Sequence, residues 1–332
     1  MGLATDFLVS AASLPGVATE PGSAGGHPIR NLLCPIDFSE FSLKAFQYAR
    51  GLARRFGSRL FVQHTVELPP IQPIGEAESA AFQQGVQASL RRSGMEMRRL
   101  TAFARLQLRD LEIVVNEGDV CERLAQSIDR NRIDLVVMGT HGRRGFLRPL
   151  LGSVTETILR RSPCPVLTVG RPVSDFVTPD EVRPCHLKTI LLPTDFSRES
   201  VRALTMALDW AAGCSAKIIL FHAVEKDAAP KDGKTGLSPG NSPSLEKEIG
   251  QAWEALQDRL PAQAAKNIEI ESEVRHGNPA EQIIRFAEEN HIDLIMMGSR
   301  GTGKAGHPWG STTSRVVRDG RFPVLAVPHH PA

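Results

Sequence analysis

The chain has 332 residues, about twice the size of a typical domain, so we expect two domains. Hydrophobic residues make up 41% of the composition, charged residues make up 23%, and the formal net charge is +2. These values are typical of a globular protein and disfavour nucleic acid or an acidic membrane surface as a partner. The sequence contains no apolar run of about 18 residues, so we expect no membrane-spanning helix.

The N-terminal residues 1–27 are predicted to form a disordered arm, because they are small, polar and interrupted by Gly and Pro. They lack the basic start of a signal peptide. The five cysteines are odd in number, widely spaced and without a CxxC pair, which argues against a disulfide framework and a zinc site. We therefore expect inert thiols, several of them in the core, and a cytoplasmic protein.

Short apolar runs alternate with helical patterns after the arm, as in parallel βαβ units. Apolar residues at helical spacing separate the first two runs, and Gly57 ends that helix, as Gly213 is expected to do in the second half. Five strands joined by right-handed crossovers predict a doubly wound α/β sheet in the order 3-2-1-4-5. The expected strands are Leu32–Ile36, Leu60–Gln63, Leu111–Val115, Leu135–Met138 and Val166–Val169.

The second half of the chain repeats the first. The segment NLLCPIDFS at 31–39 returns as TILLPTDFS at 189–197, and IDLVVMGTHG at 133–142 returns as IDLIMMGSRG at 292–301. The offset is 158 residues for the first pair and 159 for the second. A repeat that holds its register over such distances indicates a duplicated domain. We predict an arm at 1–27, a first domain at 28–170, a linker at 171–185 and a second domain at 186–328.

A glycine-rich loop follows the fourth strand of the first copy. Gly139 and Gly142 open the loop, and Gly152 and Ser153 lead the chain into a helix. Glycines let backbone N–H groups approach an anion closely, and a helix N-terminus adds unpaired donors and partial positive charge. Ser153 is expected to cap the helix, with the Thr155 hydroxyl beside its first turn. The loop therefore predicts a phosphate site at the carboxyl end of a parallel strand.

Asp37 directly follows the first strand, which neighbours the fourth strand in the expected order. Its carboxylate is therefore placed to accept hydrogen bonds from a nucleoside near the glycine loop. The alternative is that Asp37 only caps the following helix. Taken together with the loop, the binding role is the better interpretation.

These motifs resemble the universal stress protein family, and its ATP-binding branch in particular. The shared features are P-x-D-F-S after the first strand, G-x2-G-x9-G-[ST] after the fourth and C-P-V-L near the end of the first copy. The resemblance implies a five-stranded parallel sheet, dimerisation through the last strand, and an adenine nucleotide site. We expect ATP or another adenine nucleotide, with Mg²⁺ or Mn²⁺ beside it. The implied site residues are Asp37, Thr65, Val66, Met138, Gly139, Gly142, Gly152, Ser153, Val154 and Thr155.

The second copy departs from this pattern. Its loop is one residue shorter between the second and third glycines, and it carries the rigid, bulky pair Pro308 and Trp309. A deletion in a phosphate loop redirects several N–H donors at once, so the second site is expected to be weaker or degenerate. The weaker candidates are Asp195, Met297, Gly298, Gly301, Gly310, Ser311 and Thr312.

Other motifs carry less weight. Residues 298–305 approximate a P-loop, but Ala305 replaces the hydroxyl that binds Mg²⁺. Residues 301–306 imitate a dinucleotide fingerprint, but they follow the fourth strand rather than the first. His64 and His222 match between the copies and are expected to be structural.

Three functions remain open at this point: a nucleotide-binding stress-response module, a nucleotide-free interaction scaffold, and a weak ATP hydrolase. The hydrolase is disfavoured, because only His141 lies near the predicted phosphates as an acid or base. The two halves are expected to pack as an internal pseudo-dimer through 166–169 and 324–327, which leaves a further homodimer open.

Overall fold

The structure is a computed structural model, and it does not describe the whole chain. The expected arm at 1–27 and most of the expected linker lie outside the described residues. The described ranges are 29–68, 76–108, 110–142, 151–170, 175–177, 185–224, 268–301 and 310–328.

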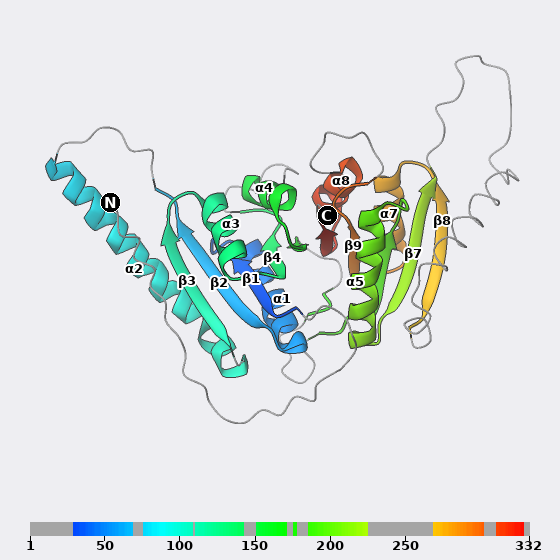
Figure 1. Cartoon of the computed structure of the whole chain (residues 1–332), viewed down its shortest axis with the longest axis horizontal. Helices are drawn as coiled ribbons and strands as arrows, with labels where there is room; N and C mark the ends of the chain where they lie inside the picture. The colour runs from blue at the N-terminus through cyan, green and yellow to red at the C-terminus, as the bar shows by residue number, and fades with distance from the viewer. Residues whose placement is uncertain are drawn as a thin grey trace, which may run out of the picture.

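Ten strands form one continuous sheet (Figure 1). The first half supplies β1 (Asn31–Pro35), β2 (Arg59–Val66), β3 (Leu111–Glu117), β4 (Leu135–Gly139) and β5 (Val166–Val169). The second half supplies β6 (Thr189–Pro193), β7 (Lys217–Val224), β8 (Ile270–His276), β9 (Leu294–Gly298) and β10 (Val324–Val327). The order across the sheet is β3-β2-β1-β4-β5-β10-β9-β6-β7-β8. Each half therefore has the predicted order, and its described pairings are all parallel.

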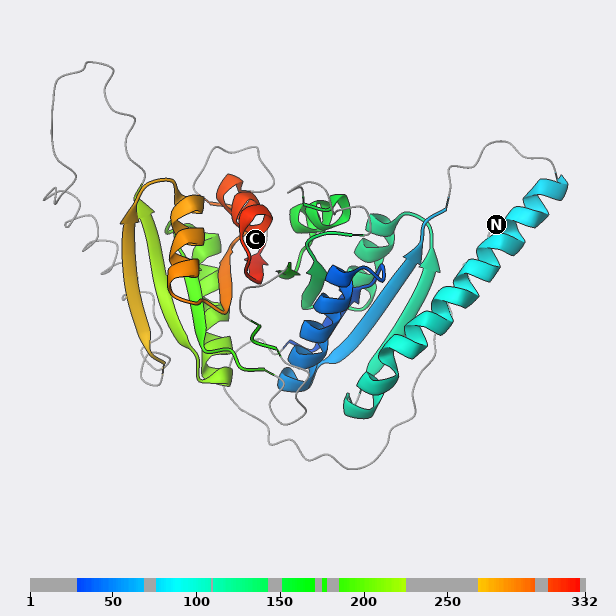
Figure 2. The same ribbon diagram turned by 180° about the vertical axis from the view of Figure 1, so that it is seen from behind.

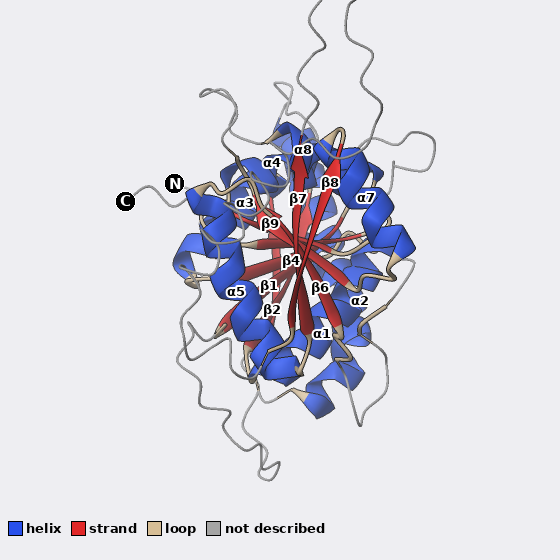
Figure 3. Ribbon diagram, turned by 90° about the vertical axis from the view of Figure 1, so that its right-hand side faces the viewer, coloured by secondary structure: helices blue, strands red, loops and turns tan. Residues whose placement is uncertain are grey.

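Helices cover both faces of this sheet (Figure 3). The helices of the first half are α1 (Glu40–Phe56), α2 (Glu76–Gln107), α3 (Val120–Arg130) and α4 (Ser153–Arg161). Those of the second half are α5 (Arg198–Cys214), α7 (Pro279–Glu289) and α8 (Ser311–Asp319). Buried side chains of α1, α2 and α5 pack on one face, and those of α3, α4, α7 and α8 pack on the other. Seen from behind, α2 runs along β3 at one end of the sheet, and β8 lies at the other end (Figure 2).

Residues at both ends of the first helix of each half act as its caps. Ser39 caps α1 by accepting a hydrogen bond from the Ser42 N–H, and Gly57 ends it in the left-handed conformation at φ 67°. The expected stop at Gly213 in the second half is wrong. There α5 continues through Cys214, and Ser215 takes the left-handed conformation at φ 56°.

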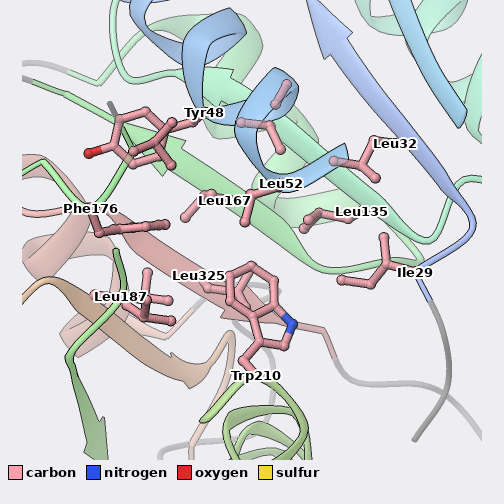
Figure 4. Close-up of a cluster of buried hydrophobic side chains, with 14 of the residues drawn as sticks. Ile29, Leu32, Tyr48, Leu52, Leu135, Leu167, Phe176, Leu187, Trp210 and Leu325 are labelled. Atoms are coloured by element: carbon pink, nitrogen blue, oxygen red, sulfur yellow. The ribbon is translucent and has the colours of Figure 1, made fainter. Parts of the chain in front are cut away.

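The two halves join edge to edge, as predicted. Strands β5 and β10 pair antiparallel, with Leu325 opposite Leu167. Beside them, the ring of Phe56 in α1 lies against that of Trp210 in α5, with the ring centroids 5.2 Å apart. Leu167, Trp210 and Leu325 belong to one hydrophobic cluster that draws on both halves (Figure 4). The joint is therefore part of the core.

A short piece of the expected linker packs into this joint. Phe176 is 1% exposed, and its ring meets that of Tyr48 edge-on at 4.9 Å (Figure 4). The Tyr48 hydroxyl donates to Asp175 Oδ1 at 2.7 Å, and Lys44 forms an ion pair with the same carboxylate. This part of the connection is anchored to α1.

Among the described residues, no helix has the length and hydrophobicity needed to cross a bilayer.

Tyr48 offers a direct spectroscopic test of this packing, because it is the only tyrosine in the chain. Burial, and then the hydrogen bond to Asp175, raise the pKa of Tyr48 above the ordinary value of about 10. Because the folded state holds the neutral phenol, its stabilising contribution is complete below about pH 10 and is lost as the pH rises further. Absorbance at 295 nm should therefore show no ionisation until the protein unfolds. Ionisation with an ordinary midpoint in the folded protein would contradict this packing.

Candidate functional site

The turn between β1 and α1 is organised by one oxygen of Asp37. Asp37 Oδ1 accepts a hydrogen bond from the Ser39 N–H at 2.9 Å, and Phe38 between them has φ 62°. Ser39 itself is the helix cap. The alternative in which Asp37 merely caps α1 is therefore wrong.

The other oxygen of Asp37 reaches the glycine loop. A Cβ built on Gly142 would lie 2.8 Å from Asp37 Oδ2, closer than side chains in proteins approach. The carboxylate and the loop glycine, 105 residues apart, are thus in contact at the carboxyl edge of β1 and β4. A side chain at position 142 would displace the carboxylate.

The start of α4 differs in detail from the sequence prediction. Gly152 is the N-cap, and within the described residues no side chain caps this helix end. Ser153 is the first helical residue, so the prediction that it caps the helix is wrong. The Gly152 N–H donates to the Thr140 carbonyl at 2.9 Å, and Thr155 Oγ1 donates to the Gly139 carbonyl at 2.8 Å. These bonds fix the first turn of α4 against the end of β4, and the Thr155 hydroxyl serves to hold it there.

Gly139 is required by packing. A Cβ at this position would lie 2.8 Å from both the carbonyl carbon and the Cβ of Phe41, at the start of α1. The side chain of Met138 is 4% exposed and points into the core beneath α3 and α4, where Val154 also packs. Met138 can therefore face a ligand only through its backbone, whereas Val154 is half-buried. Residues 143–150 of the loop lie outside the described part of the chain.

The expected nucleoside side carries polar groups that sequence analysis missed. Thr65, at the end of β2, donates to Asn116 Oδ1 at 2.8 Å, and Gln63 Nε2 donates to Thr65 Oγ1 at 3.4 Å. Gln63 is 1% exposed, and its Oε1 has no hydrogen-bond partner among the described residues. The alternation of Gln63 and Thr65 along β2 was the available signal. The neighbouring Val66 is half-buried.

The two matching histidines hold the turns at the ends of β1 and β6. His64 Nδ1 lies 2.7 Å from the carbonyl oxygen of Ile36, and His222 Nδ1 lies 2.8 Å from that of Thr194. The His64 ring also packs on Phe38. The structural role predicted for both histidines is confirmed.

The second half repeats the geometry of Asp37 and its loop. Asp195 Oδ1 accepts a hydrogen bond from the Ser197 N–H at 3.1 Å. A Cβ on Gly301 would collide with the Asp195 carboxylate. Thr313 Oγ1 donates to the Gly298 carbonyl at 2.8 Å. The turn and both ends of the second loop therefore match those of the first.

The second helix start is also built alike. Gly310 is the N-cap of α8 with no side-chain cap among the described residues, Ser311 begins the helix, and Thr312 follows in its first turn. The Met297 side chain is buried. The shortened part of the loop, 302–309, lies outside the described residues. Among the described residues, a clear difference between the halves lies in their second strands. Phe221 and Ala223 of β7 occupy the positions of Gln63 and Thr65 of β2.

Within the described ranges, no group of three or more His, Cys, Asp or Glu side chains is arranged to hold a metal ion.

Known proteins are similar to this chain over most of its length. A sequence model of the universal stress protein family matches residues 28–170 and 186–328. Universal stress protein Slr1230 of Synechocystis is 23% identical over 317 residues, covering 90% of this chain and 99% of its own. The crystal structure of a universal stress protein from Archaeoglobus fulgidus covers 92% of this chain and 100% of its own, with 21% identity and a TM-score of 0.65. A universal stress protein solved in complex with cAMP is 27% identical, covers 44% of this chain and 99% of its own, and has a TM-score of 0.34.

Proposed function

Because the chain belongs to the universal stress protein family, we propose that its first half binds an adenine nucleotide, with ATP as the first candidate. The observation that carries the proposal is the contact of Asp37 with Gly142 at the carboxyl edge of β1 and β4. Open α/β sheets bind ligands at this edge, where the strand order reverses. Two elements predicted to bind the two ends of a nucleotide therefore adjoin each other.

The phosphate end of the proposed site is the start of α4. A helix N-terminus without a side-chain cap presents backbone N–H donors and partial positive charge to an anion. Here Ser153, Val154 and Thr155 would offer their backbone N–H groups, whereas the Gly152 N–H is engaged with the Thr140 carbonyl and the Thr155 hydroxyl with that of Gly139. Mg²⁺ or Mn²⁺ would bind through the phosphates and water.

The nucleoside end would lie at Asp37 and Thr65. On this proposal the Asp37 carboxylate, whose Oδ1 accepts the Ser39 N–H, also accepts hydrogen bonds from ribose hydroxyls. A charged acceptor strengthens such a hydrogen bond to about 1.5–3 kcal/mol. On this proposal the protein is a cytoplasmic stress-response module whose affinity for partners changes with the bound nucleotide.

The second half is proposed to serve mainly as the structural partner of the first. Phe221 and Ala223 place apolar groups where the first half has Gln63 and Thr65. We therefore assign the nucleotide-free scaffold function to the second half of the chain.

Isothermal titration calorimetry with Asp37→Asn tests the proposal, and Asp195→Asn is the matched control in the second half. Asn keeps an oxygen for the Ser39 N–H but loses the charge, so we expect ATP affinity to fall roughly 10- to 100-fold. Asp195→Asn should leave the strong site unchanged. ATP with Mg²⁺, AMP and cAMP are the ligands to titrate, and a melting curve checks that each variant is folded. The proposal fails if the native chain releases no heat with any of them, or if Asp37→Asn binds as tightly as the native chain.

A further inference from the structure

Two cysteines that are remote in sequence meet at the base of the joint. Cys185 lies just before β6 and Cys214 is the last residue of α5, and their Sγ atoms are 4.0 Å apart. Both side chains are partly exposed at the rim of the hydrophobic core. The prediction of five inert thiols is therefore open to revision for this pair.

The remaining cysteines have different surroundings. Cys34 and Cys164 are buried, and burial raises the pKa of both thiols, that of Cys164 to about 11. Cys121 is partly exposed, and burial raises its pKa too. These three thiols therefore remain protonated at neutral pH and react slowly.

The first half of the chain contributes a cation to the pair. Arg55, in the last turn of α1, extends its guanidinium to within 3.6 Å of the Cβ position of Gly213, the residue before Cys214. The hydrogen bond between the two sulfurs, and then the nearby Arg55 guanidinium, lower the pKa of the Cys214 thiol. The hydrogen bond to Cys214, and then burial, raise the pKa of Cys185. These surroundings therefore favour the thiolate form at Cys214 and the thiol form at Cys185.

We propose that Cys214 and Cys185 form a thiol oxidation site at the joint of the two halves, with Cys214 as the nucleophile, Cys185 as the resolving thiol and a small hydroperoxide as the oxidant. The Cys214 thiolate attacks the peroxide oxygen, the O–O bond breaks, and the leaving alkoxide or hydroxide takes up a proton. Cys185 then loses its proton and attacks the sulfenic sulfur, and the S–O bond breaks to release water. In sum, two thiols and one hydroperoxide give one disulfide, one alcohol or water, and one water.

The geometry requires only a small movement for this step. A disulfide bond is about 2.05 Å long, so the two sulfurs must approach by about 2 Å. Rotation of the two side chains with a small backbone adjustment covers such a distance. The disulfide would tie the connection between the halves to α5 and would remove a thiolate near the Arg55 guanidinium. The proposal does not depend on nucleotide binding.

Peroxide treatment of the full chain at pH 7, followed by denaturing thiol counts and peptide mapping, tests the proposal. With equimolar hydrogen peroxide, we expect the free thiols to fall from five to three and a cross-linked peptide to join Cys185 to Cys214. Cys185→Ser should leave a sulfenic acid on Cys214 that dimedone traps. The matched control Cys121→Ser removes a partly exposed cysteine outside the pair and should form the same cross-link.

The role of Arg55 has a separate readout. At pH 7 iodoacetamide should alkylate Cys214 roughly five- to tenfold faster than Cys121, since greater thiolate content outweighs lower nucleophilicity. Arg55→Gln should slow the alkylation of Cys214 several-fold and move its pH profile upward. The proposal is overturned if the native protein keeps all five thiols after peroxide, if the cross-link joins other cysteines, or if Arg55→Gln leaves the profile unchanged. If Cys185→Ser fails to fold, dimedone trapping in Cys185→Ala and the cross-link map of the native protein test the proposal in its place.

Discussion

Gly139→Ala is expected to lower the free energy of unfolding by about 2 to 3 kcal/mol, the upper range for overpacking a tight interior. The added methyl would lie 2.8 Å from the carbonyl carbon and the Cβ of Phe41. These atoms belong to the first turn of α1, so the helix itself must move away from β4. Because Asp37 lies in the turn that leads into that helix, the displacement would also disturb the candidate site. Urea unfolding followed by circular dichroism measures the change.

Gly85→Ala is the matched control for this substitution. Gly85 is exposed in α2, and its added Cβ would meet nothing within 4 Å. Since Ala favours a helix more than Gly, the control should be unchanged or up to about 1 kcal/mol more stable. If Gly139→Ala unfolds at the same urea concentration as this control, the packing argument for Gly139 is incorrect.

Leu325→Ala is expected to cost about 3 kcal/mol, within the 2–5 kcal/mol typical of a buried leucine. Leu325 is 0% exposed and stands opposite Leu167 across the β10–β5 pair, in the cluster that joins the halves (Figure 4). Because the cavity opens between the halves, the loss should destabilise their union as well as the second half. Met95→Ala, at an exposed position on α2, should stay within about 0.5 kcal/mol of the native protein.

A double-mutant cycle makes the second prediction specific to the joint. Leu167→Ala and Leu325→Ala remove side chains that share one cluster, so their effects should deviate from additivity by about 0.5 kcal/mol or more. Additivity within a few tenths of a kcal/mol would mean that the two leucines stabilise separate cores, contrary to the pairing described above.

Much of the fold can be predicted from patterns that are visible in a single sequence. The repeat from 31–39 to 189–197 shows the duplication, and apolar runs alternating with helical stripes predict parallel strands. The strand order then follows from the few topologies that right-handed crossovers allow. The proximity of Asp37 to Gly142 was predictable for the same reason, because it needs only the order of the strands.

The remaining details depend on backbone geometry and on contacts between distant residues. Ser153 has a better capping side chain than Gly152, yet the backbone path places Gly152 at the cap. Gly139 carries no mark in the sequence that distinguishes a packing role from anion binding. Cys185 and Cys214 are 29 residues apart and form no motif, so only the folded chain reveals them as neighbours.

The antiparallel pairing of β5 with β10 occurs within a single polypeptide. Dilution therefore cannot separate the halves, because the tether keeps each at an effective concentration near the millimolar range around the other. Separately synthesised halves would form pairs of like halves as well as pairs of unlike halves. A single chain that carries both halves joins one loop of each kind in every pair. The stoichiometry of its two unlike loops is thus set during translation and is independent of how much protein the cell makes.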